Sequence, residues 1–252
     1  MTKKEILTEL LRWRYAHRGF HQKPEVPENS LAAFRRALLA GFGIELDIHL
    51  TRDGQLAVIH DASLKRTCGV DRRIEELTLK EAKGYCLEES DEHIPDFTEV
   101  LKLVDGMVPL IVELKTEDGN HEALCRRAFA ELDQYKGLYC VESFDPKAVL
   151  WLRRNRPQAV RGQLAGSLRK DDFPLPALAD FLLRNLWVNV AGKPDFVAYK
   201  FAERENRAFR RFAGAKFFWT IRSEAELGEA ERLSAAAIFE GFDPRKIDEE
   251  KK

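Results

Sequence analysis

The chain alternates between two hydrophobic patterns, one with the period of a strand and one with the period of a helix. Short runs rich in β-branched and aromatic residues predict strands at 13–16, 43–49, 56–60, 109–115, 138–142, 160–164, 196–199, 217–221 and 236–240. Apolar residues at helical spacing predict helices between many of them, at 31–39, 77–83, 97–104, 122–132 and 146–154. We therefore predict an α/β protein built from repeated strand and helix units.

Repeated units of this length predict a parallel sheet, and their number predicts a (β/α)8 TIM barrel with its active site at the C-terminal mouth of the strands. A barrel needs only eight strands, so one of the nine is surplus, and we expect it to be 160–164 or 196–199. No long linker divides the chain, which predicts one domain over 1–252. This domain is expected to begin with a short helix within 1–13, and an insertion at 62–96 could form a small cap.

Polar side chains share one face of two predicted strands. Alternate residues of a barrel strand point to the helical shell and to the interior. In the runs 43–49 and 110–115 the shell-facing positions are apolar, and charged or polar residues occupy the interior positions near the C-terminal end. These interior residues are Glu45, Asp47, His49, Glu113 and Lys115. The parity therefore gathers them at the mouth, where enzymes of this fold keep their active sites.

Three of these side chains are carboxylates, those of Glu45, Asp47 and Glu113. Converging carboxylates repel one another unless a cation lies among them, and oxygen ligands favour Mg²⁺ or Ca²⁺ over zinc. The competing interpretation is that they are surface acids on edge strands, which the shared parity disfavours. The pattern therefore predicts one divalent cation, either Mg²⁺ or Ca²⁺, as the cofactor.

Two histidines, His17 and His60, each follow a predicted strand. A lone imidazole is more often a hydrogen-bonded structural group, but a pair beside a carboxylate cluster is typical of acid and base catalysis. Arg18 and Lys115 add fixed positive charge, and the guanidinium fork suits two phosphate oxygens. Together these residues predict a hydrolytic enzyme that acts on an anionic small molecule.

Composition narrows the class of protein further. A hydrophobic content of 44% allows a full-sized core, and a net charge of −1 gives no overall field to recruit nucleic acid or a membrane surface. The four cysteines are far apart, which favours reduced thiols over a zinc site or a disulfide. The start lacks the apolar segment of a signal peptide, and no run approaches the roughly 20 apolar residues of a membrane span. We expect a cytoplasmic enzyme with no nucleic-acid partner and no stable membrane insertion, and its oligomeric state stays open.

Several short motifs, in one fixed order, together resemble the glycerophosphodiester phosphodiesterase family, a group of phospholipase-C-like TIM barrels. The motifs are YAHRG at 15–19, PENSLAAF at 27–34, GIELD at 43–47, TRDG at 51–54, HDASLKRT at 60–67, IPDFTEVL at 94–101, VELK at 112–115, ESFDP at 142–146 and WT at 219–220. The resemblance runs from about residue 14 to residue 221. It implies metal-dependent hydrolysis of glycerophosphodiesters to sn-glycerol 3-phosphate and an alcohol.

The resemblance also implies a role for each motif residue. Glu45, Asp47 and Glu113 match the metal ligands of the family, and His17 and His60 match its catalytic acid and base. In the usual scheme one histidine activates the glycerol 2-hydroxyl, the other protonates the departing alcohol, and water opens the resulting cyclic phosphate. We assign His17 as the acid and His60 as the base, and the reverse assignment stays open.

The remaining matches contact the substrate or support the site. Arg18 matches a phosphate contact and Lys115 a cation on the substrate side. Residues expected to support the site are Glu28, Asn29, Asp61, Glu142 and Trp219. The last strand departs from the Gly-x-Asp-Gly-Ile pattern that is usual in the family, because residues 237–242 read AIFEGF. The sequence therefore leaves open which of the predicted strands close the barrel after residue 158.

Two other functions compete with this hypothesis. The first is a lysophospholipase D on the same scaffold, with an apolar lid for an acyl chain. The residues that could form such a lid, which we expect instead to be a helix packed on the barrel, are Phe173, Leu175, Leu178, Phe181, Leu182, Leu186 and Trp187. The second is a catalytically silent barrel that binds phosphorylated ligands, which the two intact histidines disfavour. The alcohol moiety of the substrate is left open.

Overall fold

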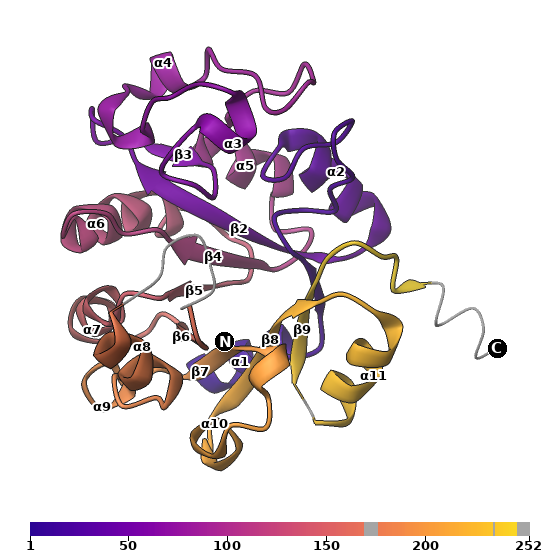
Figure 1. Ribbon diagram of the computed structural model, residues 1–252, viewed down its shortest axis with the longest axis vertical. Coiled ribbons are helices and arrows are strands. Elements are labelled where there is room, and N and C mark those ends of the chain that lie inside the picture. Colours follow the sequence, from indigo (N-terminus) through magenta and orange to yellow (C-terminus); the bar gives the residue numbers. More distant parts are fainter. Residues whose placement is uncertain (169–175, 234, 246–252) are drawn as a thin grey trace.

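Eight parallel strands close into a barrel in the computed structural model, which describes residues 1–168, 176–233 and 235–245 (Figure 1). The barrel strands are β1 (Arg14–Ala16), β2 (Gly43–Leu50), β4 (Leu110–Leu114), β5 (Tyr139–Ser143), β6 (Arg161–Ala165), β7 (Phe196–Lys200), β8 (Ala215–Ile221) and β9 (Ala236–Phe239). Strand β1 closes the barrel because it pairs with β9 on one side and β2 on the other. The predicted TIM barrel is therefore confirmed, and the unusual last strand pairs parallel with both neighbours, with a register shift against β8 between Phe218 and Ile221.

The surplus strand is β3 (Leu56–Val58), so our expectation that 160–164 or 196–199 lies outside the barrel was wrong. Both of those segments are barrel strands, β6 and β7. Strand β2 is eight residues long, and its last three residues pair antiparallel with β3, from Ile48 opposite Val58 to Leu50 opposite Leu56. The turn at Gly54, whose φ is +71°, reverses the chain. The resulting hairpin directs the segment after β3 toward the barrel mouth.

Helices surround the barrel between successive strands (Figure 1). They are α1 (Lys3–Leu10), α2 (Leu31–Ala40), α3 (Lys65–Cys68), α4 (Leu79–Ala82), α5 (Phe97–Val104), α6 (His121–Leu132), α7 (Pro146–Asn155), α8 (Ala177–Arg184), α9 (Asn189–Gly192), α10 (Arg207–Arg211) and α11 (Glu224–Arg232), with 3-10 turns η1 (Ile74–Glu76) and η2 (Phe201–Glu203). Many begin at a capping side chain. Ser30, Asp96 and Asp145 accept hydrogen bonds from the first turns of α2, α5 and α7.

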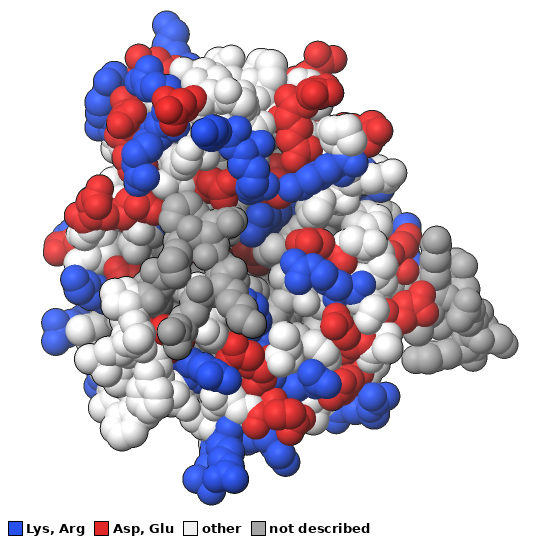
Figure 2. Space-filling view, in the orientation of Figure 1, with Lys and Arg blue, Asp and Glu red and all other residues white. Residues whose placement is uncertain are grey.

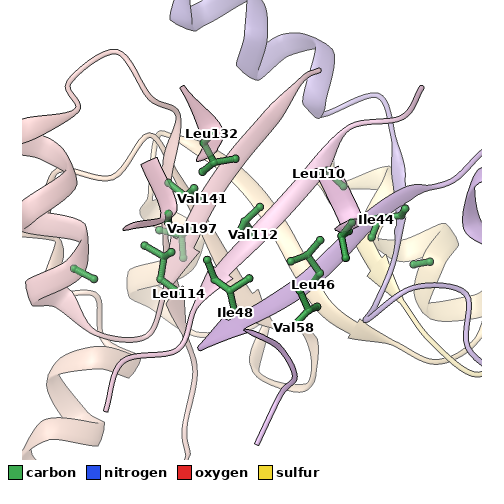
Figure 3. Packing of buried hydrophobic residues seen from close by; sticks show 14 of the residues in the cluster. Ile44, Leu46, Ile48, Val58, Leu110, Val112, Leu114, Leu132, Val141 and Val197 are labelled. Carbon is green, nitrogen blue, oxygen red and sulfur yellow. The ribbon is translucent and has the colours of Figure 1, made fainter. Parts of the chain in front are cut away.

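The two faces of the strands bury different cores. Ile44, Leu46 and Ile48 of β2 point outward and pack with Val112 and other residues beneath the helical shell (Figure 3). The interior at the N-terminal end is filled by apolar side chains beneath α1. These are Leu10, Tyr15, Ile111, Cys140, Phe196 and Phe217. The barrel is thus sealed below, which leaves the C-terminal mouth for polar chemistry. All four cysteines are free thiols, as predicted.

The excursion at 62–96 carries α3, η1 and α4 and packs on a small hydrophobic cluster of its own. This cluster includes Leu64, Ile74 and Leu87, and it also contains Ala57 and Ile59 from the β3 hairpin. The excursion is therefore anchored to the hairpin that leads to His60.

Candidate active site

Three carboxylates converge at the barrel mouth. Glu45 and Asp47 come from β2 and Glu113 from β4, and one oxygen of each lies within 4.8 Å of the others. Asp47 is the register partner of Glu113 on the neighbouring strand. All three side chains are buried, as strand parity predicts for interior positions.

Two cations lie against this triad. Lys115 Nζ is 2.9 Å from Glu113 Oε1 and 3.4 Å from Asp47 Oδ1. Arg18 donates its backbone N–H to Glu45 Oε2 over 2.9 Å, and its Nε lies 3.5 Å from Asp47 Oδ2. Burial alone raises the pKa of Asp47, but Lys115, His60 and Arg18 outweigh it and hold that pKa well below its ordinary value. Asp47 is therefore the member of the triad that stays ionised.

The other two carboxyls hold their protons more tightly. Burial, reinforced by the charges of Asp47 and Glu113, raises the pKa of Glu45 well above its ordinary value. Burial also raises the pKa of Glu113 to about 7, against the opposing charge of Lys115. Asp47 Oδ1 is buried and accepts no hydrogen bond within the described part of the chain. When all three carboxylates are ionised, their negative charges outnumber the two cations, and a crowded oxygen cluster of this kind fits a hard divalent cation.

His60 reaches the mouth through the β3 hairpin, where the N–H of Ile59 donates to the carbonyl of Asp47 over 3.1 Å. Its Nδ1 lies 2.5 Å from Asp61 Oδ1, and Arg66 Nε holds the other oxygen of Asp61 at 2.5 Å. Burial and the nearby Lys115 lower the pKa of His60 to about 4. The imidazole is therefore neutral at pH 7.

His17 directly follows β1 and contacts the triad through Glu45. Its Nε2 lies 3.9 Å from Glu45 Oε2, and its Nδ1 lies 2.5 Å from Glu240 Oε2. Burial and the charge of Arg18 lower its pKa, while Glu240 opposes the shift. The structure thus brings both predicted histidines to the carboxylate cluster.

The predicted supporting residues form a connected network around the cations. Asn29 Nδ2 donates to Asp47 Oδ2 over 2.8 Å. Glu28 accepts from Arg18 Nη1 at 2.8 Å and from Arg66 Nη2 at 2.6 Å. Because Glu28 is buried and bridges both guanidiniums, it fixes Arg18 relative to the excursion that carries Arg66.

Two other predicted supporting residues, Glu142 and Trp219, line the cavity at the mouth. Glu142, beside Glu113 in the β4–β5 register, is buried, and its Oε2 makes no hydrogen bond among the described residues. Burial and the charge of Glu113 raise its pKa well above its ordinary value. Trp219 donates its indole N–H to the carbonyl of Ala198 over 3.1 Å and meets the ring of Phe144 edge to face.

Sequence reasoning missed three residues that contact the site. Glu240 contacts His17, and Arg66 ties Asp61 to Glu28. His49, predicted only to face the mouth, places Nε2 3.0 Å from the carbonyl oxygen of His60. Glu240 carried a usable signal, since it directly follows a barrel strand at the C-terminal end. Arg66 also carried a signal, as part of the HDASLKRT motif that contains its partner Asp61, although the motif assigned it no role.

The site opens into a cavity of about 1250 Å³. Its polar lining includes Glu45, Glu113, His17 and His60. Its apolar wall is formed by residues that include Phe144, Leu164, Leu182, Leu183, Val188 and Phe201. Helix α8 supplies part of this wall. The cavity is therefore lined by both charged and apolar side chains.

The position of helix α8 shows where several residues of the predicted apolar lid lie. Leu182 and Leu183 line the cavity, whereas Leu178 and Phe181 lie on the outer face with 70% and 55% exposure. Trp187 beyond the helix is also exposed, and the lower left of the molecule shows a broad uncharged surface over α8 and α9 (Figure 2). Phe173 and Leu175 lie outside the described residues. The expected helix is present, although only part of its apolar surface packs inward.

A closed (β/α)8 barrel with a buried carboxylate triad, two cations and two histidines at its mouth defines a TIM-barrel protein whose triad could hold a metal ion. The chain belongs to the glycerophosphoryl diester phosphodiesterase family, whose sequence model matches residues 17–242. The match contains every residue of the site described above.

Curated relatives match over part of their length. A glycerophosphodiester phosphodiesterase from Bacillus altitudinis is 39% identical over 111 residues, which are 41% of this chain and 44% of that protein. A lysophospholipase D from Mus musculus is 32% identical over 134 residues, 48% of this chain and 41% of that protein. The matched region thus spans less than half the length of these relatives.

Solved structures share the fold. An Oleispira antarctica phosphodiesterase in complex with the product sn-glycerol-3-phosphate has a TM-score of 0.78 at 22% identity, covering 96% of this chain and 98% of that one. A Thermotoga maritima glycerophosphodiester phosphodiesterase has a TM-score of 0.67 at 24% identity, covering 94% and 97%. Within the described residues, each helix is too short or too polar to cross a bilayer.

Proposed function

We propose that this protein hydrolyses glycerophosphodiesters to sn-glycerol 3-phosphate and an alcohol with the help of one divalent cation. The observation that carries the proposal is the buried triad of Glu45, Asp47 and Glu113, flanked by His17 and His60. Family membership supports it, as do a relative named for this activity and a similar fold solved with this product.

Glu45, Asp47 and Glu113 would hold the ion, either Mg²⁺ or Ca²⁺. When bound, such an ion supplies positive charge that polarises phosphoryl oxygens. Arg18 and Lys115 bind the nonbridging oxygens of the phosphodiester in this proposal. Arg18 Nε suits that role because it is buried and makes no hydrogen bond within the described part of the chain. These cations thereby neutralise the negative charge that develops on the nonbridging oxygens of the phosphoryl group.

The two histidines move the protons. His60 is neutral at pH 7 and its Nδ1 is engaged by Asp61, so Nε2 is the atom that accepts the proton of the glycerol 2-hydroxyl. The alkoxide oxygen attacks phosphorus, the bond to the alcohol breaks, and His17, which begins this step protonated on both nitrogens, gives that alcohol its Nε2 proton. Water then gives a proton to the neutral His17 and attacks the cyclic phosphate, and His60 returns its proton to the 2-oxygen as the ring opens to the monoester. The roles of His17 and His60 can be exchanged without changing the products.

Phosphorus NMR of a substrate panel tests this chemistry. Glycerophosphocholine, glycerophosphoethanolamine and glycerophosphoglycerol should each be tried with ion present, since the panel also identifies the preferred alcohol. We expect a cyclic phosphate signal that rises and then decays into sn-glycerol 3-phosphate. Products other than that monoester, or no turnover of any diester, would overturn the proposed reaction.

The apolar wall favours a second candidate, a lysophospholipase D reaction. At about 1250 Å³ the cavity exceeds the roughly 300–1,000 Å³ of most small-molecule sites. A lysophospholipid has a phosphodiester for the polar lining and an acyl chain for the wall formed by Leu182 and Leu183 of α8. A lipid of this kind is also the substrate class named for the Mus musculus relative.

Comparison of glycerophosphocholine with lysophosphatidylcholine separates the two candidates. Leu182→Glu places a charge on the apolar wall and should depress turnover of the lysolipid alone. Leu178→Glu on the outer face of the same helix is the matched control and should leave both rates unchanged. Equal effects of Leu182→Glu on both substrates would exclude an acyl-binding role for the wall.

A further inference from the structure

We infer that Glu240 is a positioning residue that holds the neutral His17 ring with its hydrogen on Nδ1, so that Nε2, the nitrogen that exchanges a proton with the substrate, points toward the carboxylate triad. The inference rests on the proposed function of the site, in which His17 exchanges a proton with the substrate. It extends that function to a residue at the end of β9 that none of the sequence motifs includes.

The barrel closure itself brings the two residues together. Ala16 and Phe239 are register partners at the ends of β1 and β9. The N–H of His17 then donates to the carbonyl of Phe239 over 2.9 Å, and the N–H of Glu240 donates to that of Ile221 over 2.9 Å. The backbones of both residues are therefore held by the sheet. Their side chains are in contact, with His17 Nδ1 2.5 Å from Glu240 Oε2.

The carboxylate is held from both ends. Arg222 Nη2 donates to Glu240 Oε1 over 3.2 Å, while Oε2 faces His17. A carboxylate bound by a guanidinium acts as an acceptor, so the imidazole nitrogen that faces it carries the hydrogen. The second nitrogen, Nε2, is then the one that faces Glu45 at 3.9 Å and the reacting groups.

The other histidine has the same arrangement from unrelated parts of the chain. His60 Nδ1 meets Asp61, which Arg66 holds from its other oxygen. The two histidines thus each have a carboxylate on Nδ1 and an arginine bound to the other oxygen of that carboxylate. A purely structural ion pair at the barrel seam gives no reason for this repetition, whereas orientation of two proton carriers does.

Glu240→Leu removes the acceptor and keeps similar bulk, and Glu240→Gln keeps an oxygen without the charge. Glu226→Gln is the matched control, since Glu226 bonds the backbone N–H of Arg222. Nitrogen-15 NMR of the imidazoles, with the His17 signals assigned from a His17→Asn spectrum, reports the tautomer with the divalent ion present. Steady-state kinetics on glycerophosphocholine and an ion titration complete the comparison.

We expect Glu240→Leu to move the hydrogen of His17 partly onto Nε2 and to lower kcat by about 10- to 100-fold, with KM and ion affinity nearly unchanged. Glu240→Gln should recover part of the loss, and Glu226→Gln should match the unmodified protein. An unchanged His17 tautomer in Glu240→Leu would overturn the inference whatever the rate. If the unmodified protein hydrolyses no diester, the proposed function fails, but the NMR comparison still decides the role of Glu240.

Discussion

Replacement of Glu113 by Gln separates ion binding from fold stability. The carboxyl is buried, contacts Lys115 Nζ at 2.9 Å, and has its pKa raised by burial to about 7. Without an ion it therefore holds a proton to higher pH than an ordinary glutamate does. Gln has the same shape and keeps an oxygen for Lys115. We expect the ion-free variant to differ in free energy of unfolding by less than about 1 kcal/mol.

The effect on ion-induced stabilisation should be much larger. An ion at one hundred times its dissociation constant stabilises the folded state by about 2.7 kcal/mol. For a chain of 252 residues that corresponds to a rise in Tm of about 5–11 °C. If loss of one charged ligand weakens binding a hundredfold, the same ion concentration leaves about 0.4 kcal/mol, or about 1–2 °C.

Differential scanning calorimetry with and without Mg²⁺ or Ca²⁺ measures both quantities. Glu122→Gln on the exposed face of α6 is the matched control, because it makes the same chemical change on a side chain that does not line the cavity. The control should keep the full ion-induced shift. Retention of that shift by Glu113→Gln would refute a ligand role, and a large loss of Tm in the ion-free variant would instead mark Glu113 as structural.

Three further outcomes follow from the same contacts. His17→Ala and His60→Ala should each lower turnover by about two or more orders of magnitude while calorimetric ion affinity stays the same, and near-normal turnover in both would contradict the acid and base scheme. The Tm of the ion-free protein should decrease as the pH is raised from about 6.5 to 8. In the folded protein the raised pKa values of Glu45 and Glu113 keep protons on these carboxyls that the unfolded chain has already lost, and this stabilising contribution is lost as pH rises. Saturating ion should flatten that slope, and a rising ion-free curve would contradict the assigned directions. Leu46→Ala in the fully buried shell core should cost about 2–5 kcal/mol in a denaturant titration, and a loss below about 1 kcal/mol would show that the barrel shell repacks.

Local rules predicted the parts of the fold that depend on neighbouring residues. Helix α5 was predicted at 97–104 and is Phe97–Val104, since Asp96 and Glu99 form a capping box that fixes where it begins. The two-residue period of β2 predicted that Glu45 and Asp47 point into the barrel while Ile44 and Leu46 point to the shell. The same reasoning predicted that the carboxylate triad converges. Helix α4, predicted at 77–83, covers only Leu79–Ala82, because the preceding residues form η1 and the Thr78 cap.

Partner choice could not be predicted in the same way. The run at 56–60 has the composition of a barrel strand, and only its antiparallel pairing with β2 excludes it from the barrel. The contact of Glu240 with His17 spans 223 positions of sequence and that of Arg66 with Glu28 spans 38, so the neighbouring residues could not identify these partners. Helix α8 is apolar on both faces, so its period could not tell the cavity wall at Leu182 from the exposed Phe181.

The most direct test of a metal-dependent phosphodiesterase site is the release of sn-glycerol 3-phosphate from glycerophosphocholine by chelator-treated protein as Mg²⁺ or Ca²⁺ is added back. The account predicts no release without the ion, saturable recovery with one of the two ions, and a recovery curve shifted to much higher ion concentration in Glu113→Gln. Full activity in the presence of chelator, or superimposable curves for the two proteins, would contradict it.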